Sequence, residues 1–91
     1  MKMKNTELLE TTAHLLSVEK MRFTAKNGSE AVIVVVRTDK GNFSNYVNVW
    51  NRQNIDLDKL DEGDEIRIAY TTFVDAEKNV ARKNFVRVDY I

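Results

Sequence analysis

The stretch Asn51-Arg-Gln-Asn-Ile-Asp-Leu-Asp-Lys-Leu60 decides which fold the sequence predicts. Its apolar residues Ile55, Leu57 and Leu60 are spaced among acidic residues, a pattern that indicates a short helix near residues 55–60. The segments on both sides show the β-branched and alternating patterns of strands, with turn residues between them. The sequence therefore predicts strands on both sides of one short helix.

Three strands are predicted before this helix, and the first two are joined by a hairpin turn. The first covers most of residues 11–24, and the strong hairpin signal Lys26-Asn-Gly-Ser29 follows it. Residues 31–36, Ala-Val-Ile-Val-Val-Val, are too few for a helix and too apolar for a half-exposed strand. We therefore expect them to form a strand that is covered on both faces.

Residues 43–50 form the third predicted strand, and their alternation assigns side chains to two faces. Val47 and Val49 are expected to point into the core. Tyr46 and Trp50 have the opposite parity and are expected on the outer face, where a ligand can reach them. For Trp50 the alternatives are a core position that caps the barrel and a contact with another subunit.

Two strands are predicted after the helix, at residues 65–74 and 80–91, with Ile66 and Ile68 inside. Five strands with one short helix between strands 3 and 4 follow the order of a five-stranded antiparallel OB-fold barrel, an all-β fold. A five-stranded sandwich fragment shares the strand count, but the position of the helix favours the barrel. The polar residues 1–10 are expected to form an N-terminal arm, which leaves residues 11–91 as the OB-fold domain.

The composition argues against an enzyme, a metalloprotein and a membrane protein. The chain has no cysteine and one histidine, His14, around which no carboxylates have metal-ligand spacing, so we expect no metal and no cofactor. No Ser-His-Asp arrangement or glycine-rich phosphate loop is present, so we expect neither catalysis nor a small-molecule substrate. The longest apolar run has six residues, far fewer than the ~20 that span a bilayer. A cytoplasmic protein is expected.

Charge is unevenly distributed along a chain whose formal net charge is zero. Residues 56–65 hold six of the 14 acidic residues and only one of the 14 basic residues. The rest of the chain therefore carries a net positive charge, and one face of the molecule can be cationic while the whole stays neutral. A solvated helix or turn is the alternative explanation for the acidic segment.

Four segments, taken in order, resemble the OB domain of bacterial and phage single-stranded DNA-binding proteins. They are residues 19–28, residues 31–38, Tyr46-Val-Asn-Val-Trp50, and Leu60-Asp-Glu-Gly-Asp-Glu-Ile-Arg-Ile68. The resemblance covers about residues 19–88 and implies a non-catalytic protein of DNA replication that binds single-stranded DNA. The family's acidic tail does not follow Ile91, so we expect a short form, similar to phage or plasmid proteins, without partner recruitment through a tail.

The resemblance also implies which residues contact DNA. Aromatic residues of the family stack on bases, and Trp50, Tyr46 and Phe73 lie at or near such positions, while Ser44 replaces another aromatic. Single-strand binding requires such flat rings together with cations that contact phosphates. The basic candidates are Arg22, Arg37, Arg52, Arg82 and Lys83.

Two other functions and the oligomeric state are also considered. The neutral net charge favours an OB-fold module that binds or assembles proteins without nucleic acid, and RNA is a third candidate ligand. Self-association as a dimer or tetramer is expected, because residues 31–36 are apolar on both faces and a small barrel has a single interior. The alternative is that the N-terminal arm covers the second face. A domain of 91 residues is also only marginally stable alone.

Overall fold

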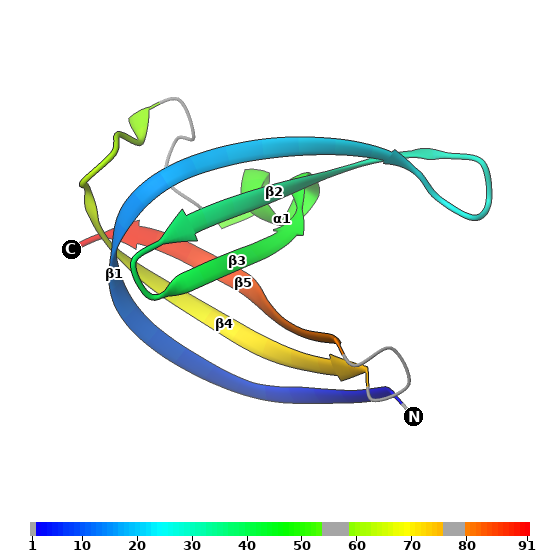
Figure 1. Ribbon diagram of the computed structural model, residues 1–91, viewed down its shortest axis with the longest axis horizontal. Helices are drawn as coiled ribbons and strands as arrows, with labels where there is room; N and C mark the ends of the chain where they lie inside the picture. Colours follow the sequence, from blue (N-terminus) through cyan, green and yellow to red (C-terminus); the bar gives the residue numbers. More distant parts are fainter. Residues whose placement is uncertain (1, 54–58, 76–79) are drawn as a thin grey trace.

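Five strands and one short helix make up the described parts of the chain. The computed structural model describes residues 2–53, 59–75 and 80–91, and the side chains of residues 7–50, 59–74 and 81–91. In chain order the elements are β1 (Lys2–Thr24), β2 (Glu30–Thr38), β3 (Gly41–Tyr46), α1 (Val47–Gln53), β4 (Glu65–Asp75) and β5 (Val80–Tyr90) (Figure 1). The predicted order of three strands, a short helix and two strands is confirmed. Within these ranges no helix is long and apolar enough to cross a membrane.

The strands close into a ring in the order β1-β2-β3-β5-β4. β1 curves around the other strands (Figure 1), and its two halves have different partners. The half from Leu15 onward is antiparallel to β2, and the half up to His14 is antiparallel to β4. The ring closes through one parallel pair, Ser44 of β3 with Asn84 of β5. The predicted antiparallel arrangement therefore holds for every strand pair except this one.

The core lies inside the ring, at the positions that strand alternation selects on β2 and β4. Its buried residues are Leu15, Val34, Val36, Phe43, Trp50, Ile66, Ile68, Phe85 and Val88. The inward positions predicted for Ile66 and Ile68 are thus confirmed. The outer face of β2 is only partly covered, since Ile33 and Val35 are half-buried. The prediction of complete cover therefore holds for one face of this strand and not for the other.

The third strand is shorter than the sequence predicts. β3 ends at Tyr46, and the chain continues as α1 instead of extending the strand to Trp50. A helix brings positions i and i+3 to one side, so Val47 and Trp50 both reach the core cluster. In a strand these two side chains would point to opposite faces. Packing of the apolar side chains therefore overrides the strand preference of the valines in this segment.

Two more segments differ from their predictions or lie outside the described residues. Residues 2–10, predicted as an arm, belong to β1 and pair with β4, from Lys2 opposite Asp75 to Glu10 opposite Ala69. Pairing here satisfies backbone groups of β4 that an open edge would expose. The helix predicted near residues 55–60 falls largely outside the described residues, although Leu60 packs against the core.

Candidate functional site

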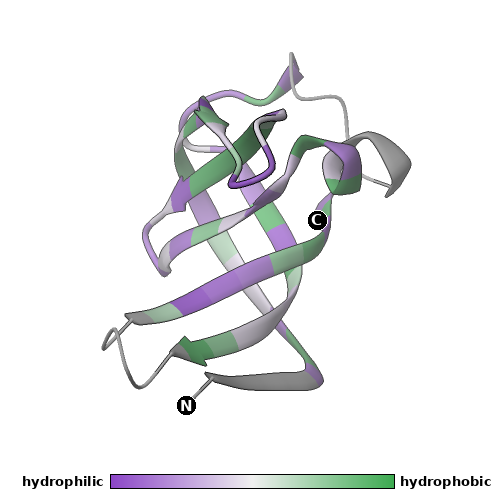
Figure 2. Ribbon diagram, turned by 90° about the vertical axis from the view of Figure 1, so that its right-hand side faces the viewer, coloured by the Kyte–Doolittle hydropathy of each residue, from purple (hydrophilic) through white to green (hydrophobic). Residues whose placement is uncertain are grey.

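A groove crosses the outer face of the sheet where β3, β4 and β5 meet. It consists of two adjoining depressions with volumes of about 490 and 610 Å³, both lined by Asn45, Tyr46, Arg82 and Asn84. The first is also lined by Phe23, Ile33 and Ser44, and the second by Val49, Thr71, Thr72, Phe73 and Val86. Figure 2 looks at this end of the molecule, where the hydrophilic start of β5 runs beside the hydrophobic end of β4.

Three aromatic side chains line this groove. Tyr46 is the last residue of β3 and is 54% exposed. Phe23, near the end of β1, is 41% exposed, and its ring centroid lies 6.5 Å from that of Tyr46. Phe73 is half-buried on β4 and lies directly opposite Arg82 of β5. The structure thus brings together Tyr46 and Phe73, two of the predicted contacts, and adds a third ring.

Sequence reasoning did not select Phe23, although the sequence contains a signal for it. The Asn-Gly turn sets the register of the β1–β2 hairpin, in which Phe23 lies opposite Ala31 and Met21 opposite Ile33. Residues directly opposite each other in an antiparallel pair share a face. Because Val34 is buried, the adjacent Ile33 faces outward, and Phe23 lies on the same outer face.

Arg82 differs from the other arginines whose side chains are described. Those arginines pair with carboxylates: Arg22 with Glu30 at 3.7 Å, Arg37 with Glu19 at 3.2 Å, Arg67 with Glu10 at 3.3 Å and Arg87 with Asp89 at 2.6 Å. Arg82 forms no ion pair with any residue in the described part of the chain, and it lines both depressions. A guanidinium without a carboxylate partner is suited to bind phosphate through two parallel hydrogen bonds.

Lys83 does not lie beside Arg82 in the groove, because successive strand residues point to opposite faces. Its Nζ donates a hydrogen bond to the carbonyl oxygen of Lys40 (3.1 Å) and lies 4.9 Å from the centroid of the Phe43 ring. Gly41 leaves room for this ammonium, since a Cβ there would lie 2.7 Å from Nζ. Lys83 therefore supports the β2–β3 turn and lines neither depression, and its predicted contact with nucleic acid stays a prediction.

The other predicted cations supply no free charge that the structure describes in the groove. Arg37 donates two hydrogen bonds of 3.2 Å to Glu19, and the ion pair of Arg22 also lies within the β1–β2 hairpin. The side chain of Arg52 lies outside the described residues. Arg82 is thus the predicted cation that the structure places with the aromatic rings.

The prediction that Trp50 is exposed for stacking is wrong. Its side chain is 4% exposed, and its ring lies edge-on to Phe85, with centroids 5.3 Å apart and an interplanar angle of 86°. The alternative prediction of a core position describes it correctly. The cause is the turn into α1 after Tyr46, which directs the indole toward the core.

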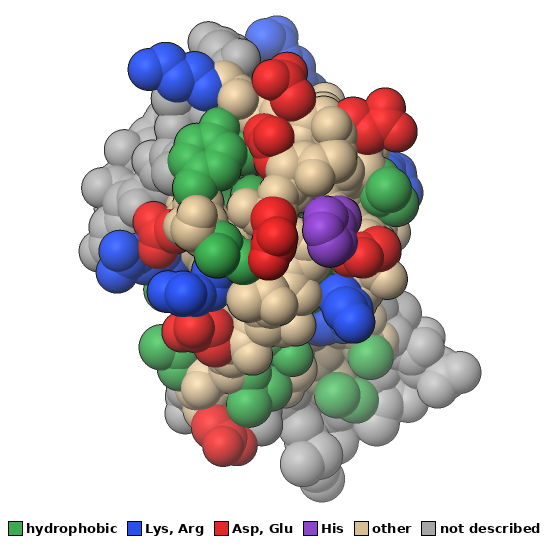
Figure 3. Space-filling view, turned by 90° about the vertical axis from the view of Figure 1, so that its left-hand side faces the viewer, with side chains coloured by type: hydrophobic (Ala, Val, Ile, Leu, Met, Phe, Trp, Pro, Cys, Tyr) green, Lys and Arg blue, Asp and Glu red, His purple; other side chains and the backbone are tan. Residues whose placement is uncertain are grey.

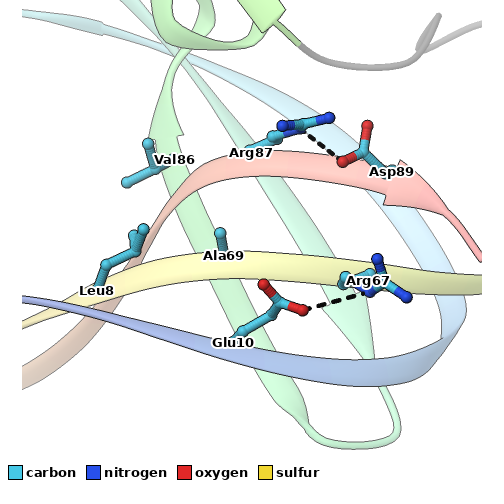
Figure 4. A pocket seen from close by; sticks show the side chains of 7 residues that line it. All are labelled: Leu8, Glu10, Arg67, Ala69, Val86, Arg87 and Asp89. Atoms are coloured by element: carbon cyan, nitrogen blue, oxygen red, sulfur yellow. Dashed lines mark ion pairs between the residues drawn. The ribbon is translucent and has the colours of Figure 1, made fainter.

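A separate depression of about 340 Å³ lies on the outer face of β1, β4 and β5. Its lining residues are Leu8, Glu10, Arg67, Ala69, Val86, Arg87 and Asp89 (Figure 4). Dashed lines in that view mark the ion pairs of Arg67 with Glu10 and of Arg87 with Asp89. Both guanidinium groups already face a carboxylate, whereas Arg82 in the groove has no ion-pair partner among the described residues.

The end of the ring around His14 is acidic. Residues 59–65 include four carboxylates, and Glu65 lies opposite His14 in the β1–β4 register. Figure 3 shows carboxylates gathered around the histidine on this face, and Figure 1 places the turn before β4 far from the ends of β3 and β4 that form the groove. The described part of the acidic segment therefore lies away from the groove.

Asp39 joins the β2–β3 turn to β1 at this acidic end. The backbone N–H of His14 donates to Asp39 Oδ1 (2.8 Å), and the His14 ring Nδ1 lies 3.3 Å from Oδ2. These hydrogen bonds, the backbone one above all, hold the pKa of the Asp39 carboxyl below its usual value. No three histidine, aspartate or glutamate side chains in the described ranges are grouped to hold a metal ion.

The lining residues of the groove are suited to non-covalent binding. The described ones present aromatic rings, amide and hydroxyl groups and the guanidinium of Arg82, and none of these described residues is a carboxylate or a histidine. A planar ligand that carries negative charge fits this set of groups. No protein-family model, curated protein or solved structure matches the chain.

Proposed function

We propose that the protein is a non-catalytic OB-fold protein that binds single-stranded DNA in this groove. The observation that carries the proposal is the guanidinium of Arg82, which has no ion-pair partner among the described residues and lies in one groove with the rings of Tyr46 and Phe73. Bases stack on such rings while a cation contacts the phosphates between them. None of the described lining residues is a carboxylate that would repel a phosphate backbone.

The topology supports the OB assignment. A closed five-stranded ring with its helix between β3 and β4 follows the plan of that fold. OB folds bind oligonucleotides on strands 2 and 3 and on the loops that join strands 1 to 2 and 4 to 5. Tyr46 ends β3, Phe23 lies just before the β1–β2 turn, and Phe73 lies near the end of β4. The three rings thus stand beside the three regions that OB folds use.

Binding of a fluorescently labelled oligo(dT) tests the proposal through its fluorescence anisotropy. Tyr46→Ala and Phe73→Ala are each expected to weaken binding by about 5- to 150-fold, because stacking contributes roughly 1–3 kcal/mol per base. Arg82→Gln is expected to weaken binding and to flatten the salt dependence, since each phosphate contact on a single strand gives a slope of about −0.7 in log affinity against log salt.

Arg67→Gln and Leu16→Ala are the matched controls, because both side chains are exposed and neither lines the groove. Both are expected to bind as the unchanged protein does. Groove variants that bind like these controls would contradict the proposed site. No binding of oligo(dT) at low salt by the folded protein would contradict the function.

A protein-binding module is the second candidate, and two observations favour it. The formal net charge is zero, and most arginines with described side chains are already paired with carboxylates. In this case the groove would hold a peptide, and neither oligo(dT) nor a matched single-stranded RNA would bind. Tighter binding of the RNA than of the DNA would support the third candidate ligand instead.

A further inference from the structure

We propose that Phe23 and Tyr46 form a clamp that holds a single unstacked nucleobase between their rings. This proposal rests on the proposed single-strand binding and assigns a role to Phe23, which neither the sequence patterns nor the resemblance selected. The clamp consists of the two rings together with Ile33 beneath them. All three residues line the smaller of the two groove depressions.

The spacing of the two rings fits one inserted base. Their centroids are 6.5 Å apart and their planes are inclined by 34°. Stacked bases are separated by roughly 3.4 Å, so a base held between two rings places those rings roughly 6.8 Å apart. A small outward rotation of either ring brings the pair to this distance. Both side chains are about half exposed, which leaves them room for this adjustment.

The two rings lie on opposite sides of β2, with Ile33 of β2 beneath them. Phe23 comes from β1 and Tyr46 from β3, and β2 lies between these strands. On β2, Ile33 lies directly opposite Tyr46 on one side and opposite Met21 on the other. Ile33 is half-buried and apolar, so it offers the inserted base no competing hydrogen bond.

Polar groups of β5 lie at the other side of the same depression. Arg82 and Asn84 are two residues apart and share a strand face. Asn84 Nδ2 donates to the carbonyl oxygen of Ser44 (3.2 Å), which ties this side chain to β3. Arg82 has no ion-pair partner among the described residues and can reach a phosphate of the nucleotide whose base is clamped.

This arrangement requires a single strand as its ligand. A base in a duplex is covered on both faces by its neighbours, so it cannot enter between two rings without being unstacked. Stacking on both faces of a base does not distinguish one base from another, because every base has a π face and the groups that differ lie on its edge. The clamp therefore selects unpaired bases without reading a sequence.

Substitutions at Phe23 test the clamp against a simple apolar contact. Phe23→Leu keeps an apolar side chain but removes the flat ring, and it is expected to weaken oligo(dT) binding by about 5- to 150-fold. Phe23→Tyr keeps the ring and is expected to bind as the unchanged protein does. Met21→Ala is the matched control, because Met21 is 50% exposed on the same strand face, two residues away, and does not line the groove.

An oligonucleotide in which abasic sites replace all bases separates stacking from other effects. If Phe23 contacts a base, the unchanged protein and Phe23→Leu bind this abasic strand equally weakly. A difference that persists on the abasic strand would overturn the clamp, because Phe23 would then act through the backbone or the fold. Thermal melts show whether each variant is folded.

The failure of the clamp can be distinguished from the failure of the proposed function. If Tyr46→Ala and Arg82→Gln weaken binding but Phe23→Leu does not, the clamp is wrong and single-strand binding stands. If the unchanged protein binds no oligonucleotide, both are wrong. In NMR spectra, an inserted base is expected to shift the Ile33 methyl signals, and Phe23→Leu is expected to abolish most of that shift.

Discussion

At the scale of single residues, Trp50 and Tyr46 show the two positions that an aromatic residue can take in a small β protein, in the core and on the surface. The indole of Trp50 is packed edge-on against Phe85 inside the ring, whereas Tyr46 is open to solvent at the end of β3. Edge-to-face pairs of this kind add to the stabilisation that burial of the rings provides. Trp50 therefore contributes to stability, and Tyr46 contributes to the surface of the groove.

Trp50→Ala is expected to lower the free energy of unfolding by about 3–5 kcal/mol, the usual result of removing a large buried aromatic side chain. Tyr46→Ala is the control and is expected to change it by less than about 1 kcal/mol, because its ring is largely exposed. Urea denaturation followed by circular dichroism measures both. Equal effects of the two substitutions would contradict the buried position of Trp50.

The lowered pKa of Asp39 is expected to make the folded protein less stable at acidic pH. Its carboxyl has a lowered pKa in the folded protein, chiefly because the backbone N–H of His14 donates to it. Such a carboxyl stabilises the folded protein when the pH is above its pKa in the unfolded chain, about 3.9. This stabilisation is lost as the pH falls through the lower pKa of the folded protein. Thermal melts from about pH 7 down to about pH 3 are expected to show a smaller decrease in Tm for Asp39→Asn than for the unchanged protein. Glu62→Gln, an exposed carboxylate in another turn, is the control.

At the scale of elements, β1 determines how the ring is assembled. One half of it pairs with β2 and the other half with β4, and its register shifts between Leu15 and Ser17, near the change of partner. Close to that change, the backbone of Leu15 also exchanges hydrogen bonds with Asp64 and Gly63 in the turn before β4. The N-terminal residues are therefore structural, and they also flank the strand that carries Phe73, which lies opposite Lys4.

Removal of residues 1–8 tests this role of β1. The deletion leaves Thr72 to Asp75 of β4 without their partners on β1. With a net contribution of about 0.5–1.5 kcal/mol for each hydrogen bond, we expect a loss of about 2 kcal/mol and a decrease in Tm of roughly 10 °C. Leu8→Ala, which changes an exposed side chain in the full-length chain, is the control. An unchanged Tm of the truncated chain would indicate that these residues act as an arm.

At the scale of the whole molecule, the two ends of the ring differ in charge and in chemistry. The end with the described acidic turn carries Asp39 and His14, and the groove with its rings and Arg82 lies at the other end. A strand of nucleic acid approaching the protein would be repelled by the first end and attracted to the second. A zero net charge is therefore compatible with the proposed ligand.

Self-association stays a prediction at this scale, and the structure offers a reason for it that does not involve the groove. Leu8, Leu16 and Ile91 are each more than half exposed and line neither groove depression. Contact between copies through such residues would remove apolar surface from water. Light scattering at micromolar concentration is expected to report a mass well above the 10.5 kDa of one chain. A mass near that of one chain would contradict the prediction and leave the groove unaffected.

The candidate site could be predicted from the sequence only in part. The outward parity of Tyr46 was visible because it lies within a clear strand pattern, and Phe73 was selected for a similar reason. The pairing of Arg37 with Glu19, residues that are distant in sequence, was not visible, and neither was the lack of an ion-pair partner for Arg82 among the described residues. Ion pairs across strands depend on register, which no local pattern of charges specifies.

The sequence by itself determined the number and order of the strands and the inward face of β4, because alternation and turn residues act over a few neighbouring positions. Only the tertiary structure decided that Trp50 turns inward on a helix, that the N-terminal residues extend β1, and that Phe23 meets Tyr46 across β2. Each of these depends on contacts between segments far apart in the chain. Such contacts become favourable only when the ring closes and its backbone groups and apolar side chains find their partners together.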